Sequence, residues 1–176
     1  MQQTGDYTIR PFKLDDLVNV ARLYLSFYDE RNNVAMGKGL ARKRPSLGAL
    51  LQSFVWRYAD EEKGNTIASV AEVNGKLVGE CMISCAWPNS EMDHIGELDV
   101  AVHRDYRGRG IGTALVMDAI KRSKKRFTLI QTYVMTSNTA SKKLLEKSGF
   151  KLSGSIPRRL RRNGKYHKDY LMYLEL

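Results

Sequence analysis

The sequence predicts an α/β (α+β) fold in which helices flank a mixed β-sheet. Two strand-like runs, residues 66–73 and 76–86, are joined by Asn74-Gly75, a strong signal for an antiparallel hairpin. Residues 95–134 then have the order strand, helix, strand, which is typical of a right-handed crossover between strands of one sheet. At 176 residues with 43% hydrophobic content the chain can build one ordinary core, so we expect one domain over residues 1–176.

Apolar spacing predicts two helices before this hairpin. Residues 7–10 are typical of a short strand, and apolar side chains then recur with a helical period over residues 14–28. The same period returns over residues 46–60. The segment between the two helices, residues 30–45, contains Gly37 and Gly39 and is expected to be a loop.

The elements after the hairpin follow from the same periodicities. Strands are expected at residues 95–102, 128–134, 150–156 and 166–174, and helices at residues 110–122 and 138–148. Asn163-Gly164 is a second hairpin signal, placed before the last strand. The complete order, β-α-α-β-β-β-α-β-α-β-β, implies a mixed sheet covered by helices.

Charge is uneven along the chain. Lys and Arg outnumber Asp and Glu by 29 to 19, which gives a net charge of +10. One basic run, residues 121–126, ends a predicted helix and complements its dipole. A second basic cluster surrounds the Asn163-Gly164 turn and consists of Arg158, Arg159, Arg161, Arg162, Lys165 and Lys168. Such a cluster can attract nucleic acid or an acidic substrate, or it can serve solubility alone.

Several classes of protein are disfavoured by composition. The three histidines, His94, His103 and His167, lack the close spacing of zinc ligands, so we expect no metal. Cys81 and Cys85 fall on one face of a strand about 13 Å apart, too far for a disulfide. No apolar run has the roughly 20 residues of a membrane helix, and the first ten residues lack a signal-peptide core. A cytoplasmic protein without membrane contact is expected.

The most informative motif is a glycine-rich stretch, residues 107–112, with the sequence Arg-Gly-Arg-Gly-Ile-Gly. It follows a predicted strand and begins a predicted helix. Glycine lets the backbone approach a bulky ligand, and the free N–H groups at a helix N-terminus favour phosphate. The spacing matches neither a Walker loop nor a dinucleotide-binding fingerprint. It fits Arg-x-x-Gly-x-Gly, which indicates a cradle for a cofactor that carries pyrophosphate.

This spacing resembles the pyrophosphate loop of the GCN5-related N-acetyltransferases (GNAT). The resemblance continues at Asn138 and at residues 144–150, Leu-Leu-Glu-Lys-Ser-Gly-Phe, which are similar to the family's Asn-bearing helix and its Gly-Phe ending. It implies a centrally splayed sheet, with acetyl-CoA lying between the strands at residues 95–102 and 128–134. The residues expected to contact this cofactor are Val100, Ala101, Val102, Arg107, Gly108, Arg109, Gly110, Ile111, Gly112, Thr113 and Asn138. Asn138 is equally suited to cap the helix that follows it.

Carboxylates near the splayed strand are the candidate catalytic bases. Glu97 and Asp99 are two residues apart on the predicted strand and therefore share a face. A base raises the reactive fraction of an amine whose pKa is about 8 to 10. Relatives often carry Tyr at the position of Leu145, where it protonates the departing thiolate, so the proton donor here is unassigned. Water, Tyr133 or Ser141 could assist.

Two functions remain in view. The first is acetyl transfer from acetyl-CoA to a primary amine, with a protein or peptide N-terminus preferred to a polyamine, amino acid or aminoglycoside. The second is a non-catalytic CoA-binding module that docks on RNA or another anionic partner through the basic hairpin. A homodimer is conceivable if the last strand, residues 166–174, lies exposed at the edge of the sheet.

Overall fold

The computed structural model describes residues 2–4, 6–30, 43–62 and 64–176. The expected loop at residues 30–45 falls largely outside the described residues. The strands are β1 (Gln2–Thr4), β2 (Tyr7–Pro11), β3 (Thr66–Val73), β4 (Lys76–Cys85), β5 (Ile95–Val102), β6 (Leu129–Met135), β7 (Lys151–Arg162) and β8 (Lys165–Glu175). The helices are η1 (Leu14–Asp16), α1 (Leu17–Glu30), α2 (Leu47–Glu62), η2 (Arg104–Tyr106), α3 (Ile111–Ser123) and α4 (Thr139–Lys147).

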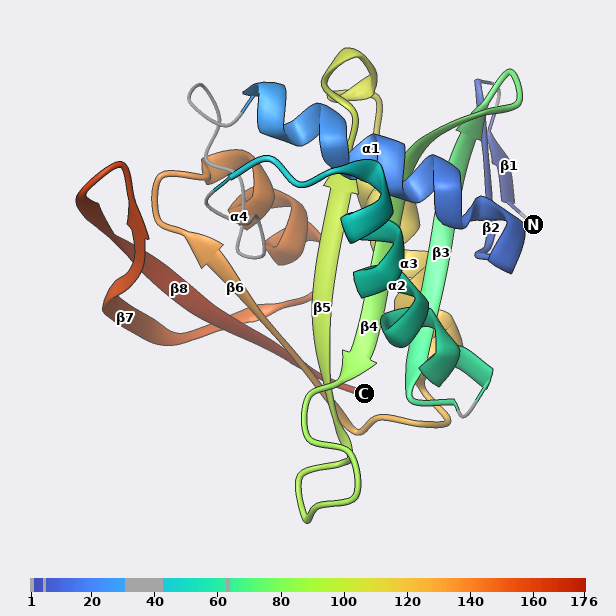
Figure 1. Ribbon diagram of the computed structural model, residues 1–176. Helices are drawn as coiled ribbons and strands as arrows, with labels where there is room; N and C mark the ends of the chain where they lie inside the picture. Colours follow the sequence, from blue (N-terminus) through green and yellow to red (C-terminus); the bar gives the residue numbers. More distant parts are fainter. Residues whose placement is uncertain (1, 5, 31–42, 63) are drawn as a thin grey trace.

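All eight strands form one sheet, in the order β1-β2-β3-β4-β5-β6-β8-β7. Neighbouring strands are antiparallel except for β5 and β6, which are parallel and joined through α3. Figure 1 shows α1 and α2 in front of this sheet and α3 behind it. The mixed sheet flanked by helices that the sequence predicts is therefore confirmed.

Two apolar clusters hold the helices against opposite faces of the sheet. Buried side chains of α1 and α2 pack on the face formed in part by Ala68, Val70 and Met82. On the opposite face α3 and α4 pack in a cluster that includes Ile83, Leu98, Ile130 and Met172. Side chains alternate between faces along a strand, so each strand contributes to both clusters. This arrangement places α1 and α4 on opposite sides of β5 and β6.

Both predicted hairpin turns are confirmed by their backbone geometry. Asn74 and Gly75 have φ angles of 49° and 75°, and Asn163 and Gly164 have φ angles of 48° and 78°. Two consecutive residues with positive φ are typical of the type I′ turn, which Asn-Gly favours.

The sheet edges differ from the sequence-based prediction. The short strand β1 was not predicted, and it pairs with β2. Strand β7 continues to Arg162, beyond the predicted end at residue 156. The last strand, β8, lies between β6 and β7 and is not exposed at the edge, so the expectation that it could pair across a dimer interface is wrong. The Asn163-Gly164 turn predicts the β7–β8 hairpin. It does not predict which of the two strands pairs with β6, because that pairing depends on long-range contacts.

Both cysteines carry free thiols. Cys81 is fully buried, and burial raises the pKa of its thiol, with the nearby carboxylates of Glu80, Asp99 and Asp118 adding to the effect. In the described ranges no three His, Cys, Asp or Glu side chains are grouped so that they could hold a metal ion. None of the helices that the structure describes has the length and apolar character needed to cross a membrane.

Candidate active site

Strands β5 and β6 separate after a short paired segment. Their parallel pairing joins Ile95 to Leu129, Gly96 to Ile130 and Glu97 to Gln131, and ends there. Figure 1 shows the two strands diverging toward their C-terminal ends. The hydroxyl of Thr132 on β6 donates a 2.8 Å hydrogen bond to the carbonyl oxygen of Leu98 on β5, at the point where the strands part. The splayed sheet that the family resemblance implies is thus present.

A cavity of about 420 Å³ occupies the gap between the two strands. Its lining comes from both strands, from the glycine-rich loop and the start of α3, from α4, and from α1. The described lining residues are Phe27, Leu98, Asp99, Val100, Ala101, Val102, Tyr106, Arg107, Gly108, Gly110, Ile111, Gly112, Thr113, Thr132, Tyr133, Val134, Asn138, Ala140, Ser141, Leu144 and Leu145. Because Phe27 and Leu145 pack on opposite faces of the sheet, the cavity passes through it.

The glycine-rich loop forms one end of the cavity. Gly110 is the N-cap of α3 and has a φ of 81°, a left-handed conformation that favours glycine. The first helical hydrogen bond of α3 runs from Ala114 N to Gly110 O at 3.0 Å. The N–H groups of the preceding residues, among them Ile111 and Gly112, therefore lie at the helix end, where they favour an anion. A Cβ at Gly112 would lie 2.7 Å from Leu144 Cδ1, so this position brings α3 close to α4.

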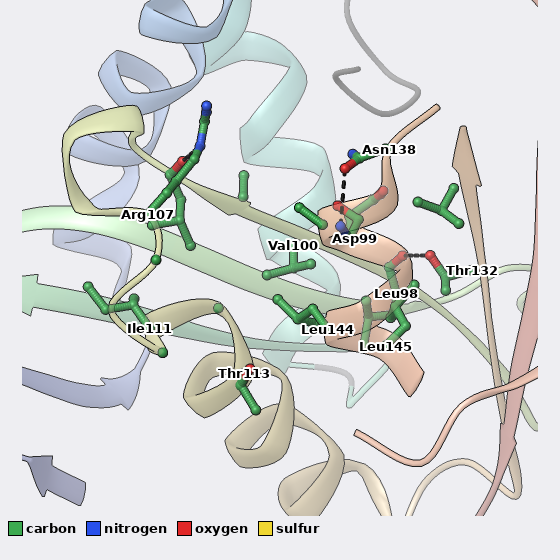
Figure 2. Close-up of a pocket in the computed structure, with 18 of the residues that line it drawn as sticks. Leu98, Asp99, Val100, Arg107, Ile111, Thr113, Thr132, Asn138, Leu144 and Leu145 are labelled. Atoms are coloured by element: carbon green, nitrogen blue, oxygen red, sulfur yellow. Dashed lines mark hydrogen bonds between the residues drawn. The ribbon is translucent and has the colours of Figure 1, made fainter. Parts of the chain in front are cut away.

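Arg107 turns its guanidinium toward α1. It forms a bidentate pair with the buried carboxylate of Glu30, with Nη1 to Oε2 at 2.7 Å and Nη2 to Oε1 at 3.2 Å. Its Nε also donates to the carbonyl oxygen of Val102 at 2.9 Å. Figure 2 shows this side chain extending toward α1. The sequence predicts that Arg107 contacts the cofactor; the structure includes Arg107 in the cavity lining and pairs its guanidinium with Glu30 of α1.

The other predicted cofactor residues fall into two groups. Val100, Ala101, Val102, Gly108, Gly110, Ile111, Gly112, Thr113 and Asn138 all line the cavity. Arg109 is not among the described lining residues, and it donates to the carbonyl oxygen of Asp105 at 3.2 Å. Asn138 caps α4, because its Oδ1 accepts from Ser141 N at 3.1 Å (Figure 2). This N-cap role was one of the two that its position suggested.

The two candidate bases occupy different places on β5. Asp99 lines the cavity beyond the point where the strands separate. Glu97 is the last residue of β5 to pair with β6, opposite Gln131, and it is not one of the described residues that line the cavity. Strand alternation puts both carboxylates on the sheet face that α1 and α2 cover. Asp99 is therefore nearer than Glu97 to the space between the strands.

Leu145 lies in the wall of the cavity and is almost fully buried, with 2% of its surface exposed. Tyr133 and Ser141, which the sequence suggested as auxiliary groups, also line the cavity. Sequence reasoning missed Phe27, Tyr106 and Thr132. Thr132 could have been noticed in the sequence, since it is a polar residue at one of the alternate positions of β6 that face the hydrophobic core.

Comparison with known proteins identifies the family to which this chain belongs. The acetyltransferase (GNAT) family model matches residues 40–150. The chain is 33% identical over 147 residues to an uncharacterized N-acetyltransferase of Methanocaldococcus jannaschii, covering 82% of this chain and 60% of the relative. It is 35% identical over 91 residues to an N-alpha-acetyltransferase of Sulfurisphaera tokodaii, covering 47% of this chain and 54% of the relative.

The fold also matches a protein from Salmonella typhimurium that was solved with its cofactor acetyl-CoA. The TM-score is 0.81 at 20% sequence identity, covering 98% of this chain and 95% of that one. The matched part of the chain spans less than two thirds of the two relatives described above.

The chain belongs to the acetyltransferase (GNAT) family. Its loop, its forked strands and the helix that Asn138 caps occur in the order that the sequence resemblance implied. The expectations for the family and the fold, and for acetyl-CoA as the donor of this family of N-acetyltransferases, are confirmed.

Proposed function

We propose that this protein transfers an acetyl group from acetyl-CoA to a primary amine. The observation that carries the proposal is a cavity that begins at the glycine-rich end of α3 and reaches Asp99 between the forked strands. The helix end suits the pyrophosphate of CoA. The free edges of β5 and β6 suit an amide-bearing pantetheine arm, because their backbone groups no longer pair with each other.

The acceptor amine has to lose a proton to attack the thioester. An ammonium with a pKa of about 8 to 10 is mostly protonated at neutral pH, so a carboxylate near it assists the reaction. Asp99 is the carboxylate that we assign to this role, because it lines the cavity, and Glu97 is suited to act through a water molecule. The backbone N–H groups of Val100 and Val102 are suited to polarise the thioester carbonyl, as oxyanion-hole donors do.

The thiolate leaves next to an apolar wall that includes Leu145. A thiol has a pKa near 8.5, so its anion is a tolerable leaving group even without a dedicated acid. Tyr133 and Ser141 are two of the hydroxyl-bearing residues that line the cavity, and either is suited to supply a proton. The reaction is therefore feasible with Leu145 in place of a tyrosine.

A protein or peptide N-terminus is the proposed acceptor class, ahead of a polyamine, an amino acid or an aminoglycoside. The net charge of +10 repels polycations at long range. The similarity to an N-alpha-acetyltransferase supports the same preference. The test is CoA release from acetyl-CoA with a panel of these amines, combined with calorimetric titration of acetyl-CoA.

Substitution of the glycine-rich loop tests the site itself. Gly110→Asp introduces bulk and negative charge at the proposed pyrophosphate position and should abolish acetyl-CoA binding. Gly75→Asp is the matched control, because Gly75 has a similar φ of 75° in the β3–β4 turn, away from the cavity. Retained affinity in Gly110→Asp would contradict the placement of the cofactor.

A non-catalytic CoA-binding module is the second candidate, and Leu145 is the observation that favours it. This alternative predicts tight acetyl-CoA binding without turnover of any amine. It also predicts RNA binding that weakens steeply with salt and depends on the basic side chains of the β7–β8 hairpin. Charge reversal at Arg161 and Arg162 should then abolish RNA binding and leave acetyl-CoA affinity unchanged.

A further inference from the structure

Arg159 places a cation beside the candidate active site. Its guanidinium carbon lies 3.7 Å from the ring centroid of Tyr133, and Tyr133 lines the cavity. The two residues belong to strands that are not neighbours, because β8 lies between β6 and β7. The Arg159 side chain therefore reaches across β8 to the rim of the cavity. It does so on the sheet face of α1 and α2, since Val134, the next residue after Tyr133, packs on the opposite face.

A bulge in β7 allows this reach. Pairing between β7 and β8 passes from Ile156–Asp169 to Leu160–His167, so three residues of β7 lie opposite the single residue Lys168. Arg158, within this bulge, has a φ of 55°, a conformation that is unfavourable for a residue with a Cβ. Bulges redirect side chains and are common beside active sites. Here the residue that follows the unfavourable conformation is Arg159.

The polar groups of Arg159 are available for a ligand. The side chain is half-buried, and within the described part of the chain its only interaction is the stack on Tyr133. A guanidinium has five N–H donors along its edge, and stacking on an aromatic ring leaves this edge open. By contrast Arg107 and Arg10 donate to carboxylates of the protein. A half-buried cation of this kind is suited to bind an anion from outside.

Charges of opposite sign therefore flank the fork on one face of the sheet. Asp99 and Glu97 lie on β5, and Arg159 lies over β6. We infer that the acceptor is a primary amine that carries a carboxylate a few bonds away, and that Arg159 selects it through this carboxylate. The inference rests on the proposed function, since it assigns the acceptor's amine to the side of Asp99. The carboxylate can belong to a free amino acid or to an acidic residue near a peptide N-terminus.

The test compares acceptors that differ only by carboxylate and carboxamide. One arm uses peptides with Asp or Asn at the first, second or third position, and the other uses free amino acids and their amides. The wild type should favour the acidic member of at least one pair by about tenfold or more in kcat/KM, as expected for a hydrogen-bonded charge pair. The arm in which the preference occurs identifies the source of the carboxylate.

Substitution at Arg159 separates selection from a structural role. Arg159→Gln should remove most of the preference by raising KM for the acidic acceptor more than KM for the neutral one. Arg159→Lys should restore part of it, and Arg159→Glu should favour an acceptor with a Lys in place of the Asp. Arg161→Gln is the matched control, because Arg161 is on the same hairpin, is exposed, and lies over Tyr166 at 5.6 Å. This control should keep the wild-type preference.

Two outcomes would overturn the inference while leaving the proposed function intact. One is equal turnover of acidic and neutral acceptors by the wild type. The other is an equal loss of preference in Arg161→Gln and Arg159→Gln, which would indicate a general effect of net charge. Failure of the wild type to turn over any amine would instead overturn the proposed function, and the inference with it. Thermal unfolding of each variant verifies that it is folded.

Discussion

Arg107 and Glu30 form a bidentate ion pair between residues that are 77 positions apart, with Nη1 and Oε2 separated by 2.7 Å. Glu30 is the last residue of α1 and only 5% of its side chain is exposed, while Arg107 lies in the loop before α3. The same guanidinium holds the carbonyl oxygen of Val102 at the end of β5. One side chain thus fixes the glycine-rich loop to both a helix and a strand.

Removal of this cation should destabilise the fold. Arg107→Met leaves the Glu30 carboxylate buried without this partner and should lower the free energy of unfolding by about 1–3 kcal/mol, below the value for fully buried pairs because Arg107 is partly exposed. The change should lower Tm by roughly 2–4 °C for each kcal/mol in a chain of this size. Arg104→Met is the control, since its pair with Asp105 is largely exposed and should matter little. Equal Tm values for the two variants would contradict the prediction.

Thr132 should control the geometry of the fork. Thr132→Val removes the donor to the Leu98 carbonyl at a buried position and should cost about 1–2 kcal/mol of stability. Because this bond lies where β5 and β6 part, acetyl-CoA affinity should fall as well. Thr132→Ser keeps the hydroxyl and should retain most of both properties. Calorimetric titration and chemical unfolding measure the two effects, and a valine variant with wild-type affinity would contradict the role in the fork.

The two carboxylates of β5 should contribute unequally to turnover. Asp99→Asn should lower kcat by about 100-fold or more, the usual contribution of a general base, without changing the dissociation constant of acetyl-CoA. Glu97→Gln should lower kcat less, because Glu97 lies behind the point where the strands separate. Steady-state rates of the two variants with the best amine test this order. The reverse order would assign the base to Glu97, acting through water.

Asp16 should contribute to the acid sensitivity of the fold. Burial tends to raise the pKa of this carboxyl, but hydrogen bonds from Arg10 and from the backbone N–H of Lys13 outweigh it and hold the pKa below its usual value. The folded state thus favours the ionised form, so this contribution is complete above about pH 4, the pKa of an unfolded Asp, and is lost as pH falls through the lower folded value.

Asp16→Asn should therefore flatten the dependence of stability on pH. Urea unfolding of the variant and the wild type between about pH 2 and pH 6 measures this difference, because the variant lacks the titrating group. Asp15→Asn is the control, since Asp15 is an exposed neighbour in the same turn. Parallel curves for Asp16→Asn and the wild type would contradict the prediction.

Local chemistry explains why much of the fold could be predicted from the sequence. Asn74-Gly75 and Asn163-Gly164 form their turns with nearly the same backbone angles, because the preference for positive φ lies in the residues themselves. The glycine-rich loop likewise follows a strand and begins α3 as its spacing indicates.

The features that were missed depend on contacts between distant residues. The partner of Arg107 lies 77 positions away, and the insertion of β8 beside β6 is set by pairing across the sheet. The different positions of Glu97 and Asp99 follow from the residue at which β5 and β6 part, which no local pattern encodes. The reach of Arg159 to Tyr133 depends on a bulge whose sequence, Pro-Arg-Arg, carries no recognised turn signal.

The passage of the cavity through the sheet affects how the two substrates can bind. Its lining runs from Phe27 on the side of α1 to Leu144 on the side of α4, so two molecules can enter from opposite faces and meet end to end. For the proposed reaction, this arrangement allows both substrates to be bound at the same time, so that the acetyl group can pass directly between them in a ternary complex.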